Sequence, residues 1–295
     1  MQLLIVLLPL LSPANNSTSE VGRAFIEKVM VARDFEAAKG LAAEDMLFTD
    51  PTAHTLGMAL SEGIRGRTKI LAKMRSFNVG TVTMEPSYEF SAGPYHCFVG
   101  TFSSMPPGAK AATGFPFMTV LQVEDGVVAE RLDFGDYDPY IPDDKRIDGL
   151  HGDMDHPMVK SAKAYVAAYG QRDVETMGSL CADHVVFQDR TAAVIGAGDP
   201  IEGRAGVMGM LKSALASVDS FEIDADYMFF HGNYAVFAGD VSYSLPGARM
   251  GLEQETFGIT HSMAIVLRFA DGEIVRHDDF ADYGSFLKAA SKAKR

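Results

Sequence analysis

Apolar and polar residues follow one order of spacings along the chain, and that order occurs twice. In the second half, residues 156–172 carry apolar side chains at the three- and four-residue intervals of an amphipathic helix. A short helical stretch follows at 174–182, and Gly203-Arg204 opens a third helix. Four runs rich in β-branched and aromatic residues come next, at 221–230, 234–243, 256–269 and 274–280. The pattern predicts helices followed by a strand meander.

The first half has the same order. Helices are predicted at 21–33 and 35–43, and a third begins at Gly66-Arg67. The strand-like runs are 79–90, 96–103, 115–123 and 127–134. Asp125-Gly126 and Asp271-Gly272 separate the last two runs of each half, which indicates tight hairpins. Helices followed by an antiparallel meander predict an α+β domain in each half.

The residues themselves also repeat. Segment 48–53 (FTDPTA) returns as 187–192 (FQDRTA), an offset of 139 residues (189 − 50). Segment 132–137 (LDFGDY) returns as 278–283 (DDFADY), at an offset of 146 (279 − 133). Solenoid repeats are only about 20–50 residues long. The sequence therefore predicts a duplicated domain, with units at 20–139 and 158–295 joined by a linker at 140–157.

This order of elements resembles the nuclear transport factor 2-like (NTF2-like) superfamily, in particular its SnoaL-like, ketosteroid isomerase-like and limonene epoxide hydrolase-like members. The resemblance covers nearly the whole chain, once per half. It implies two tandem cone-shaped α+β barrels, with helices packed on a curved antiparallel sheet around an apolar pocket. Many members pair as dimers, so the resemblance also implies a pseudo-dimer within one chain, which could be monomeric. The fold alone does not fix a function, because it carries many chemistries.

Composition narrows the range of partners. A formal charge of −13 argues against nucleic acid and anionic membranes as partners. The two cysteines fall at non-equivalent places in the repeat and indicate neither a disulfide framework nor a cysteine metal site. No metal-ligand spacing, glycine-rich phosphate loop or Gly-x-Ser-x-Gly elbow is present in the sequence. We therefore expect no metal and no cofactor, a small apolar organic ligand, and acid–base chemistry.

The N-terminus carries a possible targeting segment. Residues 3–11 form an apolar run broken only by Pro9, which is too short to span a bilayer but fits a signal peptide. We predict a signal peptide or N-terminal extension over residues 1–19, and hence a secreted or organelle-lumen protein. A frayed extension on a cytoplasmic protein is the alternative.

Asp189 is the first catalytic candidate. The segment around it, VVFQD, resembles the one that holds the general-base aspartate of ketosteroid isomerases. Tyr165 lies 24 residues earlier (189 − 165), in a context similar to that of the isomerase's oxyanion-hole tyrosine. A carboxylate would remove a proton next to a carbonyl, and a phenol would stabilise the enolate. Asp50 is the equivalent aspartate of the first half, where Ile26 replaces the tyrosine. Alternatively, both aspartates accept hydrogen bonds at a strand end and Tyr165 is a core residue.

Asp279 is the second candidate. The segment HDDFAD at 277–282 resembles a stretch of limonene epoxide hydrolases, with Asp279 at their water-activating aspartate. Asp133 is its counterpart in the first half. The resemblance implies that Asp189 and Asp279 face one cavity, as do Asp50 and Asp133. Two carboxylates in one apolar cavity titrate at different pH values, which leaves one as acid and one as base. The alternative is that Asp279 only orders the last strand.

Three further residues are candidates for substrate binding: His261, Arg204 and Phe187. His261 lies on a strand predicted to line the second pocket, and a structural role is its alternative. Arg204 begins the third helix and is expected either to pair with nearby carboxylates or to bind substrate. The hypothesis is a cofactor-free isomerase, cyclase or hydrolase acting on a polyketide-, terpenoid- or steroid-like compound. The alternative function is a non-catalytic binding or protein-association module.

Overall fold

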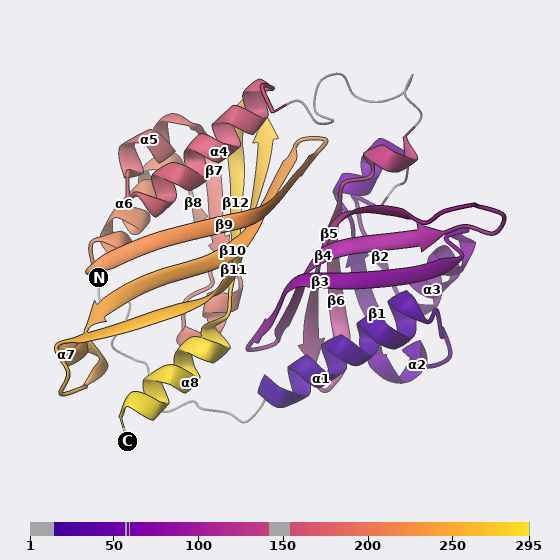
Figure 1. The fold of residues 1–295 in the computed structure, drawn as a ribbon, viewed down its shortest axis with the longest axis horizontal. Coiled ribbons are helices and arrows are strands. Elements are labelled where there is room, and N and C mark those ends of the chain that lie inside the picture. The colour runs from indigo at the N-terminus through magenta and orange to yellow at the C-terminus, as the bar shows by residue number, and fades with distance from the viewer. Residues whose placement is uncertain (1–14, 57, 59, 142–153, 295) are drawn as a thin grey trace. The chain divides into compact units, whose positions relative to one another are not determined.

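The computed structural model describes residues 15–56, 58, 60–141 and 154–294 (Figure 1). The chain divides into two compact units, 13–151 and 152–295, called here the first and second domain. Most of the predicted signal peptide and linker lies outside the described residues. The first helix begins at Asn15, inside the segment predicted as an extension. Thr18 of this helix is buried and its hydroxyl donates to the Gly93 carbonyl (2.9 Å), so the helix packs on the domain from its first turns.

The first domain opens with helices and ends with strands. Its helical elements are α1 (Asn15–Phe25), the π-helical η1 (Ile26–Val31), α2 (Ala38–Leu41), η2 (Thr52–Leu56), α3 (Arg67–Ser76) and η3 (Asp138–Tyr140). Its strands are β1 (Ala42–Thr49), β2 (Ile64–Arg65), β3 (Thr81–Ala92), β4 (Tyr95–Met105), β5 (Thr113–Glu124) and β6 (Val127–Gly135).

The second domain repeats this order. Its helical elements are α4 (Pro157–Gly170), α5 (Val174–Ser179), η5 (Thr191–Ile195), α6 (Arg204–Leu215), α7 (Gly247–Met250) and α8 (Tyr283–Ala293). Its strands are β7 (Cys181–Asp189), β8 (Ile201–Glu202), β9 (Ser220–His231), β10 (Tyr234–Pro246), β11 (Thr256–Ala270) and β12 (Glu273–Ala281). The change of sequence offset falls between β10 and β11, where α7 lies.

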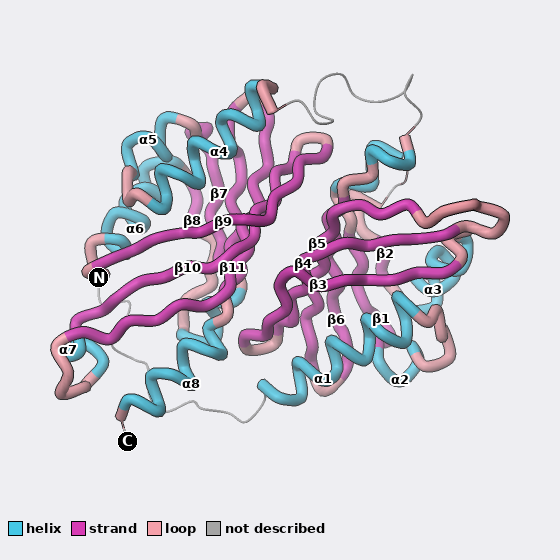
Figure 2. The backbone as a smooth tube through the Cα atoms, in the orientation of Figure 1, coloured by secondary structure: helices cyan, strands magenta, loops and turns pink. Residues whose placement is uncertain are grey.

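Each domain has one six-stranded sheet, and the two strand orders match (Figure 2). The orders are β2-β1-β6-β5-β4-β3 and β8-β7-β12-β11-β10-β9. The predicted duplicated α+β fold is therefore confirmed. Two details differ from the prediction. The sheets are mixed, because β1 pairs in parallel with β6, and β7 with β12. They are also open, since the first and last strands in each order do not pair with each other.

The parallel pairs follow from the chain path. A strand that returns beside an earlier one after a long connection, rather than a hairpin, is free to run parallel to it. Both strands of such a pair then end at the same edge of the sheet. Asp50 follows β1, and Asp189 ends β7, at that edge.

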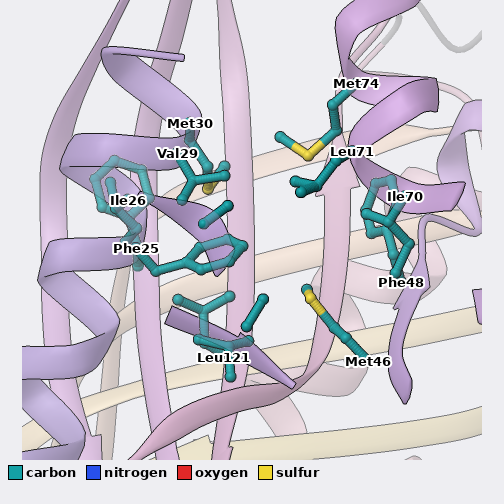
Figure 3. Close-up of a cluster of buried hydrophobic side chains, with 14 of the residues drawn as sticks. Phe25, Ile26, Val29, Met30, Met46, Phe48, Ile70, Leu71, Met74 and Leu121 are labelled. Atoms are coloured by element: carbon teal, nitrogen blue, oxygen red, sulfur yellow. The ribbon is translucent and has the colours of Figure 1, made fainter. Parts of the chain in front are cut away.

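The core of the first domain lies between its helices and the inner face of its sheet. Figure 3 shows side chains from α1 and η1 facing others from α3, β1 and β5. Phe25, Met46, Ile70 and Leu121 are each at most 1% exposed. In the second domain, the predicted apolar face of α4 is buried in the same way, including Ala162 and Tyr165. Within the described ranges, no helix combines the length and apolar character needed to cross a bilayer.

Candidate functional site

The second domain contains a cavity of about 470 Å³. This volume falls within the roughly 300–1,000 Å³ of small-molecule sites. Most of the wall is apolar, and α6, β10, β11 and α8 each contribute apolar side chains to it. The apolar lining includes Met210, Leu211, Leu215, Val241, Met263 and Phe286. Such a lining suits a mainly apolar organic molecule.

Two aspartates line this cavity from neighbouring strands. Asp189 ends β7, and Asp279 lies directly beside it on β12 in the parallel register. Asp279 is only 3% exposed. The structure thus brings together the two carboxylates that the sequence predicted would share a cavity, and it does so through the parallel strand pair.

The chain after β7 holds the Asp189 carboxylate in place. Its Oδ1 accepts hydrogen bonds from Thr191 Oγ1 (2.8 Å) and the Ala192 N–H (3.0 Å). Its Oδ2 accepts one from the Tyr283 hydroxyl (2.7 Å). Thr191 Oγ1 also accepts from the Ala281 N–H (2.7 Å), which ties the turn to the end of β12. The carboxylate is therefore oriented before any ligand arrives.

Burial raises the pKa of Asp189 from an ordinary 3.8 to about 6. The neighbouring charge of Asp279 raises this pKa further, whereas the hydrogen bonds from Tyr283, Thr191 and Ala192 oppose the shift. A carboxyl that titrates close to neutral pH is suited to take up a proton and return it during catalysis.

Tyr165 and Tyr169 have different positions relative to the cavity. Tyr169 lines it, and its hydroxyl donates to Asp279 Oδ2 (3.1 Å). Tyr165, one turn earlier on α4, is 0% exposed and is not part of the lining. Its hydroxyl lies 2.9 Å from Nδ1 of His277, behind Asp279. The expectation that Tyr165 donates directly to a bound substrate is therefore corrected, because its hydroxyl is already engaged away from the cavity.

The three substrate-binding candidates separate into two groups. Phe187 and His261 line the cavity. Arg204 does not, since its guanidinium lies 3.0 Å from Asp183 Oδ1 and 3.7 Å from Glu273 Oε1. It pairs with carboxylates, which was the alternative stated for it.

His261 is held as a neutral side chain. Burial lowers its pKa. Its Nδ1 lies 3.3 Å from the Ser262 carbonyl oxygen, and its Nε2 lies 3.3 Å from the Tyr243 hydroxyl. Because a carbonyl can only accept, Nδ1 carries the proton and Nε2 accepts from Tyr243. His261 and Tyr243 therefore form a second polar group on the cavity wall, next to the aspartates.

The first domain repeats the hydrogen bonds of Asp189 around Asp50. Asp50 Oδ1 accepts from Thr52 Oγ1 (2.7 Å) and the Ala53 N–H (3.0 Å), and Oδ2 accepts from Tyr137 (2.5 Å). Burial, and then the charge of Asp133, raises the pKa of Asp50 to about 6. Both domains therefore hold this aspartate with the same set of hydrogen bonds.

The second carboxylate differs between the domains. Asp133 forms a buried ion pair with Arg131, whose Nε donates to Oδ1 (2.9 Å) and whose Nη2 donates to Oδ2. The Thr119 hydroxyl also donates to Asp133 Oδ1 (2.6 Å). Arg131 is the counterpart of His277 (277 − 131 = 146). The first domain thus neutralises its carboxylate with a cation, and the second does not.

Aromatic side chains fill the first domain where the second has its cavity. Three phenylalanines contact one another, with ring centroids 5.1–6.1 Å apart. They are Phe102, Phe115 and Phe117, at the positions that Val241, His261 and Met263 occupy in the second domain. Phenylalanine thus replaces three smaller or polar side chains and takes up more of the equivalent space in the first domain.

Metal-ligating residues do not converge within either domain. Taking each domain alone, no three His, Cys, Asp or Glu donor atoms among the described residues lie within 4.8 Å of one another. Cys97 and Cys181 are both buried.

Three functional candidates were not singled out from the sequence. Tyr169 falls within the helix predicted at 156–172. Tyr283 and His277 occur only inside the repeated and family-like segments at 278–283 and 277–282. The available signal was the recurrence of Tyr137 as Tyr283, since a tyrosine retained beside a retained aspartate suggests a hydrogen bond between them.

The raised pKa of Asp50 predicts a stability effect. Between about pH 4 and pH 6 the folded protein keeps a proton that the unfolded chain has released, so stability falls as pH rises through this window. Asp50→Asn cannot ionise. We expect it to be more stable than wild type at pH 8, on the order of 1–3 kcal/mol, and equal at pH 4. Urea unfolding at both pH values checks this, and an Asp50→Asn protein that is no more stable at pH 8 contradicts it.

Comparison with known proteins places these observations in a family. The model of the SnoaL-like domain matches the chain at residues 22–131 and again at 162–277. No protein of curated function matches the chain in sequence.

Solved structures with a similar fold each match about one domain. A protein described as a candidate SnoaL-like polyketide cyclase from Shewanella denitrificans is 20% identical, with TM-score 0.41, over 46% of this chain and 97% of its own. A limonene epoxide hydrolase-like enzyme from Mycobacterium tuberculosis is 15% identical, with TM-score 0.37, over 46% and 91%. A ketosteroid isomerase-like protein from Catenulispora acidiphila, in complex with trimethylamine, is 18% identical, with TM-score 0.37, over 44% and 92%. Together, the two family matches cover most of the sequence, and the chain belongs to the SnoaL-like domain family, with two such domains in tandem.

Proposed function

We propose that the second domain is a cofactor-independent acid–base enzyme acting on a small apolar carbonyl or epoxide compound of the polyketide, terpenoid or steroid type. The reaction would be an isomerisation, cyclisation or hydrolysis. One observation carries the proposal: Asp189 and Asp279 lie side by side on the wall of a mainly apolar cavity of about 470 Å³. Paired carboxylates in such surroundings are suited to divide acid and base roles.

Asp189 takes the role of general base in this proposal. Its pKa of about 6 leaves it mainly ionised at neutral pH, yet basic enough to accept a proton from carbon or water. Tyr283 donates to the same carboxylate and lines the cavity, as does Tyr169 at Asp279. Once Asp189 is protonated, its need for these donors falls, and a phenol becomes available to the developing oxyanion. Asp279 is the second acid or base.

The charges on the lining favour an uncharged substrate. Of the described residues that line the cavity, Asp189, Asp199 and Asp279 are acidic and none is Lys or Arg. A carboxylate or phosphate on the ligand would face these acids in a low-dielectric space with no counter-charge. A neutral ketone or epoxide avoids this cost.

The first domain would not turn over substrate in this proposal. Phe102, Phe115 and Phe117 occupy the equivalent space, and Asp133 is paired with Arg131. Its role would be structural or in association. That leaves the second domain as the site to test.

A non-catalytic binding module is the second candidate function. The observation that favours it is the matching bonding of Asp50 and Asp189, since Asp50 is only 2% exposed in a domain with phenylalanines at the positions that line the second cavity. If this bonding is only structural in both domains, the second domain binds a neutral apolar molecule without changing it. Turnover decides between the two candidates.

The experiment introduces into the second domain residues that the first domain has at the equivalent positions. Val241→Phe combined with Met263→Phe gives the second domain two of the three phenylalanines of the first. We expect turnover of a panel of ketones and epoxides, and binding of those compounds, to fall at least tenfold. The panel pairs each neutral compound with a carboxylate analogue, which should bind at least tenfold more weakly to wild type. A single methylene group that fits or does not fit a hydrophobic pocket already changes kcat/KM by about 10–200-fold.

Met228→Phe is the control. Met228 is 38% exposed on β9, so this substitution adds a phenyl ring outside the cavity. Melting temperatures check that the double variant folds, since overpacking costs roughly 1–3 kcal/mol. Undiminished turnover in a folded double variant would place the reaction elsewhere. Undiminished turnover of the carboxylate analogues would reject an uncharged substrate.

A further inference from the structure

A buried chain of polar side chains lies behind Asp279. The Tyr165 hydroxyl lies 2.9 Å from His277 Nδ1, and His277 Nε2 lies 2.5 Å from Asp279 Oδ1. Tyr169 completes the chain at Asp279 Oδ2 (3.1 Å). Tyr165 and His277 are both 0% exposed, and neither belongs to the cavity lining. They can act on a ligand only through Asp279.

The acceptors fix where the protons lie. An ionised carboxylate can only accept, so His277 Nε2 must donate to Asp279. If His277 is neutral, Nδ1 carries no proton and accepts from Tyr165. The ring cannot turn freely, because Tyr165, Tyr169 and Phe187 pack against it at 82°, with centroids 4.8–5.6 Å away. The imidazole is thus held in one tautomer and one orientation.

The first domain shows what the histidine replaces. At the same position Arg131 forks onto both oxygens of Asp133, and its guanidinium lies 4.6 Å from the ring centre of Phe48. Phe187 is the equivalent of Phe48 and packs on His277 instead. A permanent cation that occupies both oxygens suits a structural carboxylate. The imidazole of His277 occupies only one oxygen of Asp279, and the other accepts from Tyr169, which lines the cavity.

We propose that His277 is a positioning residue that holds Asp279 as a carboxylate anion aimed into the cavity, and that Tyr165 fixes the histidine tautomer needed for this. The inference rests on the proposed function. It makes Asp189 the carboxyl that exchanges protons and Asp279 its fixed anionic partner. The titratable groups around this pair and its buried chain are Tyr165 and Tyr169 from α4, Cys181 and Asp189 from β7, Asp199 from the loop before β8, Tyr243 from β10, His261 from β11, His277 from β12 and Tyr283 from α8.

The test needs no substrate. In the full chain, ¹⁵N spectra of wild-type histidines at pH 7 should show a proton on Nε2 of His277. Carbon-13 spectra of labelled aspartate should show Asp189 titrating near pH 6. In His277→Gln, Asp279 loses the imidazole as its donor, so that its charge acts less strongly on Asp189. The midpoint of Asp189 should then fall by about one pH unit.

His277→Arg is the rescue variant, because Asp50 titrates near pH 6 beside the Arg131–Asp133 pair. We expect it to restore the Asp189 midpoint to within about half a unit of wild type. Tyr165→Phe should keep the hydrogen bond between His277 and Asp279 but no longer fix the tautomer of His277. A mixture of the two His277 tautomers should then appear in the ¹⁵N spectrum. His184→Gln, at an exposed position of β7, should change neither signal.

Two results would overturn the inference. One is a folded His277→Gln protein in which Asp189 titrates as in wild type. The other is a wild-type His277 with its proton on Nδ1 alone. If His277→Gln does not fold, Tyr165→Phe alone decides, and an unchanged single tautomer rejects the role of Tyr165. Because these signals are read without substrate, inactivity on every compound would reject the proposed function and leave this result standing.

Discussion

Asp189→Asn is expected to lower turnover by the proposed enzyme by about 10²–10⁴-fold, the usual contribution of a positioned general base. The asparagine oxygen can still accept from Thr191 and Ala192, and its amide group can donate to Tyr283, whose hydroxyl then accepts. The cavity keeps its shape, but the side chain no longer takes up a proton at neutral pH. The measurement is initial rates on the ketone and epoxide panel, with melting temperature as the check on folding.

Asp50→Asn is the matched control for this prediction. It removes an aspartate with the same three kinds of hydrogen bond in the domain whose interior is filled. It should leave turnover within about twofold of wild type, because Asp50 lies in the other domain and does not contact the transition state. Equal activity of wild type and Asp189→Asn would reject the mechanism. A comparable loss in both variants would mean that the aspartates act on the fold.

Much of the fold could be predicted from the sequence because spacing and duplication support each other. Periodic apolar positions located α4, and the Asp-Gly pairs located the hairpins between the last two strands of each domain. The parallel pairing of β1 with β6 was missed. A strand's direction relative to a distant partner depends on the chain path between them, and local side-chain pattern does not record that path.

The two aspartates of the candidate site could be predicted. The resemblance to limonene epoxide hydrolases implied that Asp189 and Asp279 face one cavity. Tyr165 and Tyr169 lie four residues apart on one face of α4, so both were equally able to reach the cavity. Their hydrogen bonds distinguish them, because Tyr165 bonds to His277 behind Asp279 and Tyr169 bonds to Asp279 itself. The effect of Phe115 and Phe117 on the space in the first domain could not be predicted either. A phenylalanine on a strand is expected to be a core residue whether or not a cavity lies beside it.

Arg131→Met is expected to destabilise the first domain by about 3–5 kcal/mol, the usual cost of breaking a buried ion pair on one side. Asp133 is 1% exposed and would keep a charge with only Thr119 as a donor. Adding Asp133→Asn removes that charge while keeping an acceptor for Thr119, so the double variant should recover most of the loss. Urea unfolding of the full chain measures both.

Arg23→Met is the control, because Arg23 pairs with Glu89 (2.7 Å) at a position where its side chain is 59% exposed. Exposed pairs contribute about 0–1 kcal/mol, so this variant should differ little from wild type. If Arg131→Met costs no more than Arg23→Met, the Arg131–Asp133 pair does not stabilise the fold. The contrast drawn with His277 would then fail as well, since a permanent cation at that position would have no structural purpose.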